Sequence, residues 1–413
     1  MDKQVAGAMP RAGFGGYALL VIAACAAVFF LDGLIHTVMG PLAPYMAPDL
    51  HLGPQELGPV FSANLAGQTI GLLAFPFLTR RTGHRLVILL CAIGFALAQW
   101  ATTLAWNAPS LFAFRLIDGV FLGGCMPSCL ALVANIAPPA RKGLAVTMLF
   151  TGYGLGATMS GIVAAGFEPH GGWRAAFAFI GCLSAATAAF SWWALRGRDA
   201  PADLAAVQPD TQHRLADILA PRLVAGTLLL WLLFVAMLTI QYCLSSWLPT
   251  LLVKVGRPAD FAALSVTIFS LGGIIAALGV GLLIDRFGAA RVLVSFLLVA
   301  TALLFATGQV LASASQPVLL LLLVSAGFFF LGAYGGINVI LATYYPRHLQ
   351  AFGIGLAKSV GRIGTFIAPI LIGLGLAAGV AETSLMSIFA LPAALAAAAV
   401  AGLALTAPGR RGA

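Results

Sequence analysis

The sequence predicts an all-helical membrane protein in which twelve spanning helices form two halves of six. Only 8% of its 413 residues are charged and 61% are apolar, whereas about 25% of the residues in an ordinary soluble domain are charged. The mean hydropathy of +1.01 indicates that lipid solvates most of the chain. These values exclude a soluble enzyme, a nucleic-acid-binding domain and a disordered scaffold, so the net charge of +9 needs another explanation.

Twelve windows are long and apolar enough to cross a bilayer, which requires about 20 residues in a helix. They cover residues 17–46, 57–78, 86–105, 109–132, 143–166, 172–195, 223–249, 260–284, 290–311, 316–343, 352–375 and 383–406. The first window is too long for a cleaved signal peptide and contains an acid, so we interpret it as a membrane helix. The polar segment 196–222 divides the chain into an N-terminal half, 1–195, and a C-terminal half, 223–413.

The distribution of lysine and arginine predicts the orientation of these helices. With both termini and the central loop 196–222 in the cytoplasm, sixteen of the 22 basic residues lie on the cytoplasmic side. Three lie on the opposite side (Arg174, Lys254 and Arg257), and the remaining three lie inside helices. This bias in short loops is the positive-inside pattern, and it explains the net charge without a nucleic-acid partner.

The two halves also repeat a loop pattern at the same position. The loop after the second helix contains Arg81 and Gly83, and the loop after the eighth contains Asp285, Arg286 and Gly288. Each has an arginine, a spacer and a glycine, followed by a further cation. Two repeated six-helix halves around a central cavity are the plan of a major facilitator superfamily transporter.

Five charged side chains lie inside the predicted helices: Asp32, Arg115, Asp118, Lys358 and Arg362. An ionised group at mid-bilayer costs at least about 2.5–3.5 kcal/mol, so each needs a partner or a function. Three cations and two anions leave one positive charge at membrane depth, which favours an anionic substrate. Arginine offers a planar fork that suits a carboxylate.

The spacing of the first three charges suggests a proton-coupling site. Arg115 and Asp118 are three residues apart and can pair along one helix, either permanently or by changing partners with Asp32 during transport. A buried carboxylate near an arginine experiences opposing effects on its protonation. His36, one turn after Asp32, titrates near neutrality or is simply a packed residue. We expect Asp32, Asp118 and His36 to carry the coupled proton.

Other residues are candidates for binding the substrate. Lys358 and Arg362 are four residues apart and point from one helix face, either into a water-filled cavity or toward backbone carbonyls at a helix end. Among the aromatic residues, Tyr242 and Tyr334 are preferred because they can donate hydrogen bonds. The six cysteines lie in apolar runs without a CxxC pair, so we expect packing roles and neither metal nor cofactor.

Several segments resemble the aromatic acid:proton symporter family of the major facilitators, over nearly the whole chain. The similar segments are Asp32-Gly-Leu-Ile-His36, Glu56-Leu-Gly-Pro-Val-Phe-Ser62, Phe114-Arg115-Leu116, Leu244-Ser-Ser-Trp247, Asp285-Arg286-Phe-Gly288, Asn338 with Tyr345-Pro346, and Gly361-Arg362-Ile-Gly364. Members of that family take up benzoate- or phenylpropanoate-type anions with a proton.

The resemblance implies functions for individual positions. It places Asp32, Arg115 and Arg362 at the family's membrane-embedded acid and arginines and adds Asn338 to the substrate contacts. It also implies that two intracellular gating motifs are formed by Arg81, Gly83, Asp285, Arg286 and Gly288.

The chain departs from the family pattern at five positions. Ile35 and Asn135 stand where the family has acids, Arg80 where it has aspartate and Gln350 where it has arginine, and Lys358 replaces an expected apolar residue. We therefore expect a rearranged proton-coupling site and an altered first gating motif. We also expect that the substrate can differ from the family's usual ones and be a non-aromatic or larger organic anion.

These observations predict a monomeric, proton-coupled symporter in a bacterial inner membrane, importing an organic anion, foremost an aromatic monocarboxylate. Alternating access would come from rocking the two halves about a midplane site. An anion exchanger or uniporter, independent of pH, is one alternative. A drug or metabolite exporter is another. Antiporters of this superfamily resemble one another in a helix 5 motif that contains Gly-Pro, and the glycine-rich segment 152–161 lacks that proline. A membrane enzyme or sensor is disfavoured because the six histidines are scattered.

Overall fold

The computed structural model describes residues 14–138, 141–167, 170–196, 215–346 and 349–406. The part of the central loop at 197–214 lies outside the described residues. Over the described ranges the chain forms helices and no strand. The helices are α1 Gly16–Thr37, α2 Met39–Asp49, α3 Pro54–Thr103, α4 Ala108–Ile136, α5 Lys142–Phe167, α6 Gly172–Ala194, α7 Leu215–Ile218, α8 Val224–Lys254, α9 Ala259–Phe287, α10 Ala289–Val310, α11 Gln316–Tyr344, α12 Gln350–Ala377, α13 Glu382–Ile388 and α14 Ala390–Thr406.

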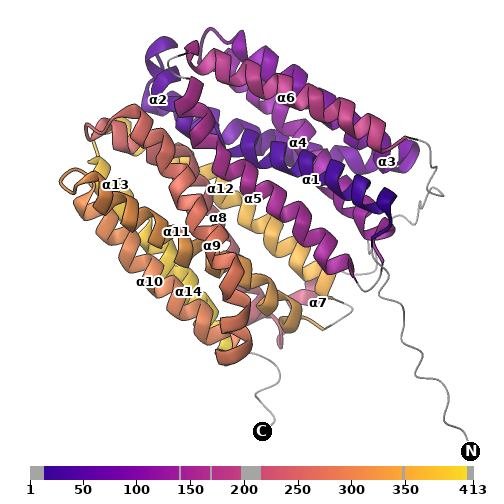
Figure 1. The fold of residues 1–413 in the computed structure, drawn as a ribbon. Helices are drawn as coiled ribbons and strands as arrows, with labels where there is room; N and C mark the ends of the chain where they lie inside the picture. Colours follow the sequence, from indigo (N-terminus) through magenta and orange to yellow (C-terminus); the bar gives the residue numbers. More distant parts are fainter. Residues whose placement is uncertain (1–13, 139–140, 168–169, 197–214, 347–348, 407–413) are drawn as a thin grey trace, which may run out of the picture.

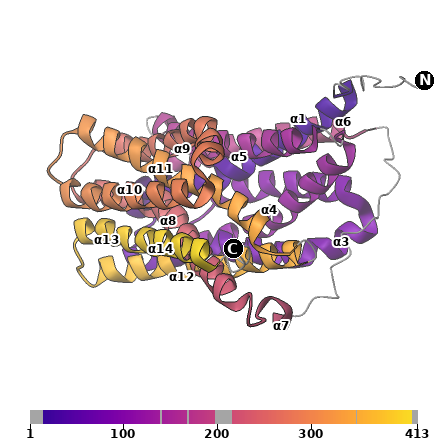
Figure 2. The same ribbon diagram turned by 90° about the horizontal axis from the view of Figure 1, so that it is seen from below.

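The helices gather into two bundles that follow the order of the chain. Helices α1 to α6 form one bundle and α8 to α14 the other, and α5, α8, α9 and α12 run where the bundles meet (Figures 1 and 2). We call the end of the molecule near Gly16, Gly83 and Gly288 the proximal end. The opposite end, near Asp49 and Lys254, is the distal end.

Eleven described helices are long and apolar enough to cross a membrane, and one of them is two spans in one. Helix α3 has 50 residues, and at about 1.5 Å per residue it would be about 75 Å long if straight. It is interrupted at Gly83, where φ is 80° and ψ is 163°. The twelve predicted spans are therefore present.

The repeated loop motif has the same backbone conformation in both halves. Gly83 separates the two parts of α3, and Gly288 separates α9 from α10 with φ 85° and ψ 143°. A positive φ strains any residue with a Cβ, so glycine is required at both turns. The predicted equivalence of the two loops is confirmed at the level of the backbone.

The first spanning segment is broken rather than continuous, in contrast to the single window 17–46. Helix α1 ends at Thr37 and α2 begins at Met39. Pro41 has no N–H to donate to the carbonyl of Thr37. At Gly40 a Cβ would lie only 1.9 Å from the Ser245 carbonyl oxygen of α8. The break and the small residue together bring the first segment of one half against the second half.

At the distal end, Asp49 ties α2 to α6. The Trp173 indole N–H donates to the Asp49 carboxylate at 2.8 Å, and the Arg174 guanidinium pairs with the same oxygen. The Trp173 hydrogen bond, followed by that of Arg174, lowers the pKa of Asp49 below its ordinary value. These contacts hold the end of the broken segment on its own half.

Glycines on α5 allow two close helix contacts. A Cβ at Gly156 would lie 1.9 Å from the Phe30 carbonyl oxygen of α1, and one at Gly161 would lie 2.2 Å from the Ala263 carbonyl oxygen of α9. Small residues let the backbones of membrane helices approach in this way. Helix α5 is thus packed against its own half and against the other half at once.

The contacts between the two halves extend from mid-helix to the distal end. The Thr267 hydroxyl of α9 donates to the Thr158 carbonyl of α5 at 2.6 Å, and the Ser62 hydroxyl of α3 donates to the Phe366 carbonyl of α12 at 2.9 Å. Phe61 and Trp247 meet edge to face with ring centroids 5.0 Å apart. The halves are therefore joined at the distal end.

Candidate substrate and proton site

Asp118 on α4 lies at the centre of a buried polar network in which both of its carboxylate oxygens have partners. Its carboxylate forms a salt bridge with Arg115 at 2.8 Å and accepts hydrogen bonds from Asn64 and Gln99, both at 3.0 Å. The Arg115 guanidinium also donates to Gln99 at 3.3 Å and to the Ile35 carbonyl of α1 at 3.2 Å. The predicted pairing of Arg115 with Asp118 is confirmed.

Glycine packing explains why this network forms. Gly67 and Gly71 of α3 pack on the α4 backbone, and Gly119 and Gly123 of α4 pack on the α3 backbone, each with a Cβ position within 2.2 Å of a carbonyl oxygen. This approach brings the first part of α3 against α4, and Asn64 reaches Asp118. The network lies in the core of the N-terminal half, where Arg115 is 1% and Asp118 0% exposed.

Asp32 on α1 has the opposite environment. Its side chain is 0% exposed, and neither carboxylate oxygen has a hydrogen-bond partner among the described residues. It lies within electrostatic range of Asp118 and Arg362 without forming a salt bridge to a described residue. A buried carboxylate without donors is strongly disfavoured in its charged form, so this side chain is suited to carry a proton.

Arg362 on α12 extends from the C-terminal half to the N-terminal half. Its guanidinium donates to the Gln68 side-chain oxygen of α3 at 3.0 Å, and the side chain is partly buried. The salt bridges of the described residues are Arg115–Asp118 and Arg174–Asp49, so no described carboxylate neutralises Arg362. A guanidinium in this position can accept a carboxylate ligand with its remaining donors.

Aromatic side chains surround Arg362 and Asp32. The His36 ring lies 4.7 Å from that of Tyr242, centroid to centroid. His36, Tyr242 and Tyr334 all lie within electrostatic range of Arg362. The Nδ1 atom of His36 has no hydrogen-bond partner among the described residues. The structure therefore brings a cation that bridges the two halves within electrostatic range of a buried acid and of aromatic rings.

The remaining predicted residues lie apart from this cluster or are not fully described. Lys358 is on the Arg362 helix but is exposed, one turn closer to the proximal end. Asn338 lies in α11, and its side chain is outside the described residues. Arg81, Gly83, Asp285, Arg286 and Gly288 lie at the proximal end, where the charged members are exposed.

Four polar or aromatic residues of the site were not among the predicted site residues. Asn64, Gln68 and Gln99 complete the hydrogen bonds of Asp118, Arg362 and Arg115, and Tyr153 lies within electrostatic range of Tyr242 and Asp32. None of these four side chains is charged at neutral pH, so the charge pattern of the sequence does not mark them. Buried amides inside apolar windows are the signal that would have found them, because each needs a hydrogen-bond partner.

Known proteins match this chain over nearly its full length. The sequence model of the Major Facilitator Superfamily matches residues 25–369 and 230–412. The chain is 30% identical to the gallate transporter of Pseudomonas putida, covering 93% of this chain and 91% of that protein. It is 33% identical to the 4-hydroxybenzoate transporter PcaK of Pseudomonas aeruginosa, covering 93% and 92%.

The fold has a close counterpart among solved structures. A crystal structure of a D-xylose-proton symporter superposes with a TM-score of 0.80 at 16% identity, covering 93% of this chain and 97% of that one. At this identity the likeness concerns the fold alone. The all-α fold of two six-helix halves is thus confirmed, and the protein is a membrane transporter rather than an enzyme. The chain belongs to the major facilitator superfamily and, within it, resembles the aromatic acid:proton symporters.

Proposed function

We propose that this transporter imports an aromatic monocarboxylate together with a proton, with Arg362 binding the carboxylate and Asp32 carrying the proton. The observation that carries the proposal is that Asp32 of the N-terminal half lies within electrostatic range of Arg362, which bridges the halves, yet neither side chain forms a salt bridge with a described residue. An arginine whose described partner is an amide suits an anion, and a buried carboxylate without a donor suits a proton.

The anion part of the proposal follows from the donors around Arg362. Gln68 occupies one N–H at 3.0 Å, and the other N–H groups can form the two-pronged contact that a planar carboxylate accepts. The exposed ammonium of Lys358, on the same helix toward the proximal end, adds positive charge to the approach. Tyr242, Tyr334 and Asn338 are proposed to contact the rest of the substrate.

The proton part follows from the contrast between the two buried acids. Asp118 already accepts from three side chains, so protonating it would weaken the interactions that its charged form makes. Asp32 would lose nothing on protonation, because it accepts no described hydrogen bond. We assign the proton first to Asp32, with His36 as a relay one turn away, and give Asp118 the task of holding Arg115 in place.

The substrate class is supported by the relatives. The names of the two curated relatives specify gallate and 4-hydroxybenzoate, both hydroxylated benzoates. Such a molecule has a carboxylate for Arg362, a ring for the aromatic side chains and a phenol for the tyrosine hydroxyls. The amphipathic tyrosine ring suits this combination of contacts.

The direction of opening follows from the joined distal end. If the basic loops lie in the cytoplasm, as the positive-inside pattern indicates, the distal end faces the outside and this conformation is sealed toward the outside. We propose a monomer in a bacterial inner membrane with cytoplasmic termini. Rocking of the halves about the Arg362–Gln68 contact would then expose the site to either side.

The direct test is uptake of labelled 4-hydroxybenzoate and gallate into proteoliposomes, with a trapped pH dye. We expect uptake to rise with an inward proton gradient, internal acidification to accompany it, and a protonophore to abolish accumulation. Uptake that is saturable but indifferent to pH would replace the symporter with the exchanger or uniporter. Efflux favoured over uptake under the same gradient would indicate an exporter.

A further inference from the structure

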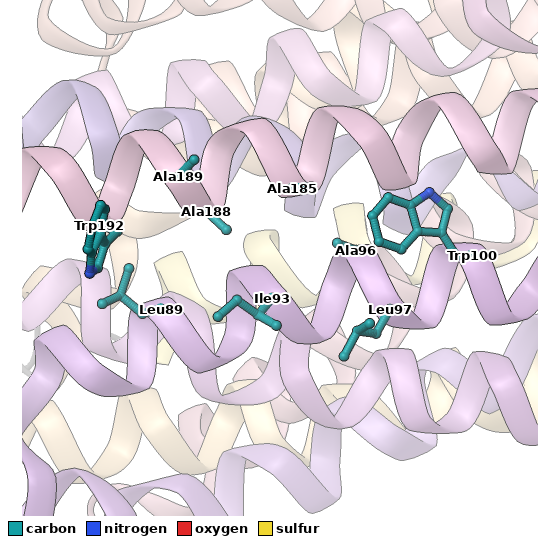
Figure 3. Close-up of a pocket in the computed structure, with 9 residues that line it drawn as sticks. All are labelled: Leu89, Ile93, Ala96, Leu97, Trp100, Ala185, Ala188, Ala189 and Trp192. Atoms are coloured by element: carbon teal, nitrogen blue, oxygen red, sulfur yellow. The ribbon is translucent and has the colours of Figure 1, made fainter.

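An apolar groove runs along the outside of the N-terminal half, away from the proposed transport site. It lies between the second part of α3 and α6, has a volume of about 330 Å³, and is lined by Leu89, Ile93, Ala96, Leu97, Trp100, Ala185, Ala188, Ala189 and Trp192 (Figure 3). Several lining side chains face outward: Ile93 is 49% and Leu97 59% exposed. Because this surface faces the bilayer, the groove is filled by hydrocarbon in a membrane.

The two helices run antiparallel along the groove. Figure 3 shows Trp192 beside Leu89 at one end and Trp100 at the other. Further along α6, a Cβ at Gly181 would lie 2.5 Å from the Trp100 ring. Eleven residue steps on each helix, from Leu89 to Trp100 and from Gly181 to Trp192, thus cover the same length, which at 1.5 Å per step is about 16 Å. This matches half of a hydrocarbon core of about 30 Å, so the groove is as long as one leaflet.

Two arginines lie beyond the proximal end of the groove. Arg85 is one helical turn before Leu89 on α3, and Arg196 lies two residues past the end of α6 at Ala194, so both follow the end of the groove formed by Leu89 and Trp192. The Arg196 guanidinium lies over the Trp192 ring, which keeps its charge at the groove end. The two salt bridges of the described residues involve neither arginine.

We propose that this groove is a binding site for an anionic phospholipid, with an acyl chain between α3 and α6 and the phosphate between Arg85 and Arg196. The apolar lining requires a hydrocarbon occupant, and the two guanidinium groups at the same end of the groove favour a phosphate at the membrane interface. Trp192 contributes an amphipathic ring at that interface. The proposal concerns neither substrate nor proton and is independent of the proposed function.

The head-group half of the proposal is tested by native mass spectrometry of the intact transporter with phosphatidylglycerol or phosphatidylcholine of identical chains. We expect one phosphatidylglycerol to be retained preferentially. The double variant Arg85→Gln/Arg196→Gln should bind it roughly thirtyfold more weakly, at about fivefold per arginine. Arg291→Gln is the matched control, because Arg291 follows Gly288 by three residues in the second half, where Arg85 follows Gly83 by two in the first, and it should bind like wild type.

The acyl half is tested with Ala189→Phe, which fills the groove from an exposed position and keeps both arginines. We expect this variant to lose phosphatidylglycerol as well. Soluble glycerol phosphate, which has no acyl chain, should displace phosphatidylglycerol from the wild-type protein only weakly.

Equal retention of both lipids, or unchanged binding by the double variant, would overturn the site. Unchanged binding by Ala189→Phe, or full competition by glycerol phosphate, would reduce it to a phosphate site. Two protein copies joined along this face without lipid would also overturn it. Each variant is compared only if it elutes as a single symmetric peak in detergent.

Discussion

Asp32 and Asp118 are both completely buried carboxylates in the N-terminal half, yet their surroundings differ in almost every respect. Asp118 is paired with Arg115 and accepts from two amides, whereas neither oxygen of Asp32 has a described partner. Burial alone therefore does not define a functional acid. The number of donors around a buried carboxylate determines whether its charge is fixed or free to be neutralised.

The same contrast separates the two arginines. Arg115 is 1% exposed and neutralised within its own half, and it also holds the Ile35 carbonyl close to the break in the first segment. Arg362 is partly exposed, has an amide rather than an acid as its described partner and bridges the halves. We interpret the first pair as scaffold and Arg362 with Asp32 as the moving charges of the transport cycle.

The largest effect is expected on stability when the scaffold pair is broken. Asp118→Ala leaves the buried charge of Arg115 without its counter-ion, and breaking a buried ion pair typically costs about 3–5 kcal/mol. Asp32→Ala removes no described hydrogen bond and should change the free energy of unfolding far less. Equilibrium unfolding of both variants in mixed detergent micelles measures the difference. Equal destabilisation by the two substitutions would remove the distinction between them.

The next effect concerns binding of the anion at Arg362. Arg362→Ala should reduce 4-hydroxybenzoate uptake at least roughly a hundredfold, because two charge-assisted hydrogen bonds of about 1.5 kcal/mol or more each are lost. Lys358→Ala, one turn away and exposed, should reduce uptake only a few-fold, since solvent and salt screen its charge. Initial uptake rates, corrected for protein in the membrane, provide the measurement. Normal transport by Arg362→Ala would reject this anion site.

A smaller effect is expected at the tyrosines and depends on the substrate. Tyr242→Phe and Tyr334→Phe each remove one hydroxyl, and a hydrogen bond contributes about 0.5–1.5 kcal/mol. The half-saturating concentration of 4-hydroxybenzoate should rise roughly two- to tenfold, while that of benzoate, which has no phenol, should not change. An equal rise for both substrates would mean that the tyrosine hydroxyls hold neighbouring protein groups in place and do not contact the phenol of the substrate.

Much of this fold could be predicted because the bilayer imposes a length on every span. The window 109–132 lies within α4, Ala108–Ile136, and the loop glycines Gly83 and Gly288 share one conformation. The break near Val38 was missed. Hydropathy averages over a window and does not report the missing N–H of Pro41 or the close approach of Gly40 to α8.

The site could be predicted only in part, for a related reason. The three-residue spacing of Arg115 and Asp118 revealed their pairing, because partners on one helix are visible in the sequence. The amides of Asn64 and Gln99 reach Asp118 from other parts of the chain, so their roles depend on tertiary packing. The isolation of Asp32 likewise depends on what surrounds it, and so does the contact of the His36 ring with that of Tyr242.

The most direct test of the central claim compares two modes of transport in Asp32→Asn proteoliposomes. Exchange of labelled for unlabelled 4-hydroxybenzoate requires the anion site, whereas accumulation driven by a proton gradient also requires a group that takes up and releases the proton. We predict that Asp32→Asn, which keeps the shape of the side chain and holds it neutral, retains exchange and loses proton-driven accumulation. Accumulation equal to that of the wild type, with the same dependence on pH, would contradict the assignment of the coupled proton to Asp32.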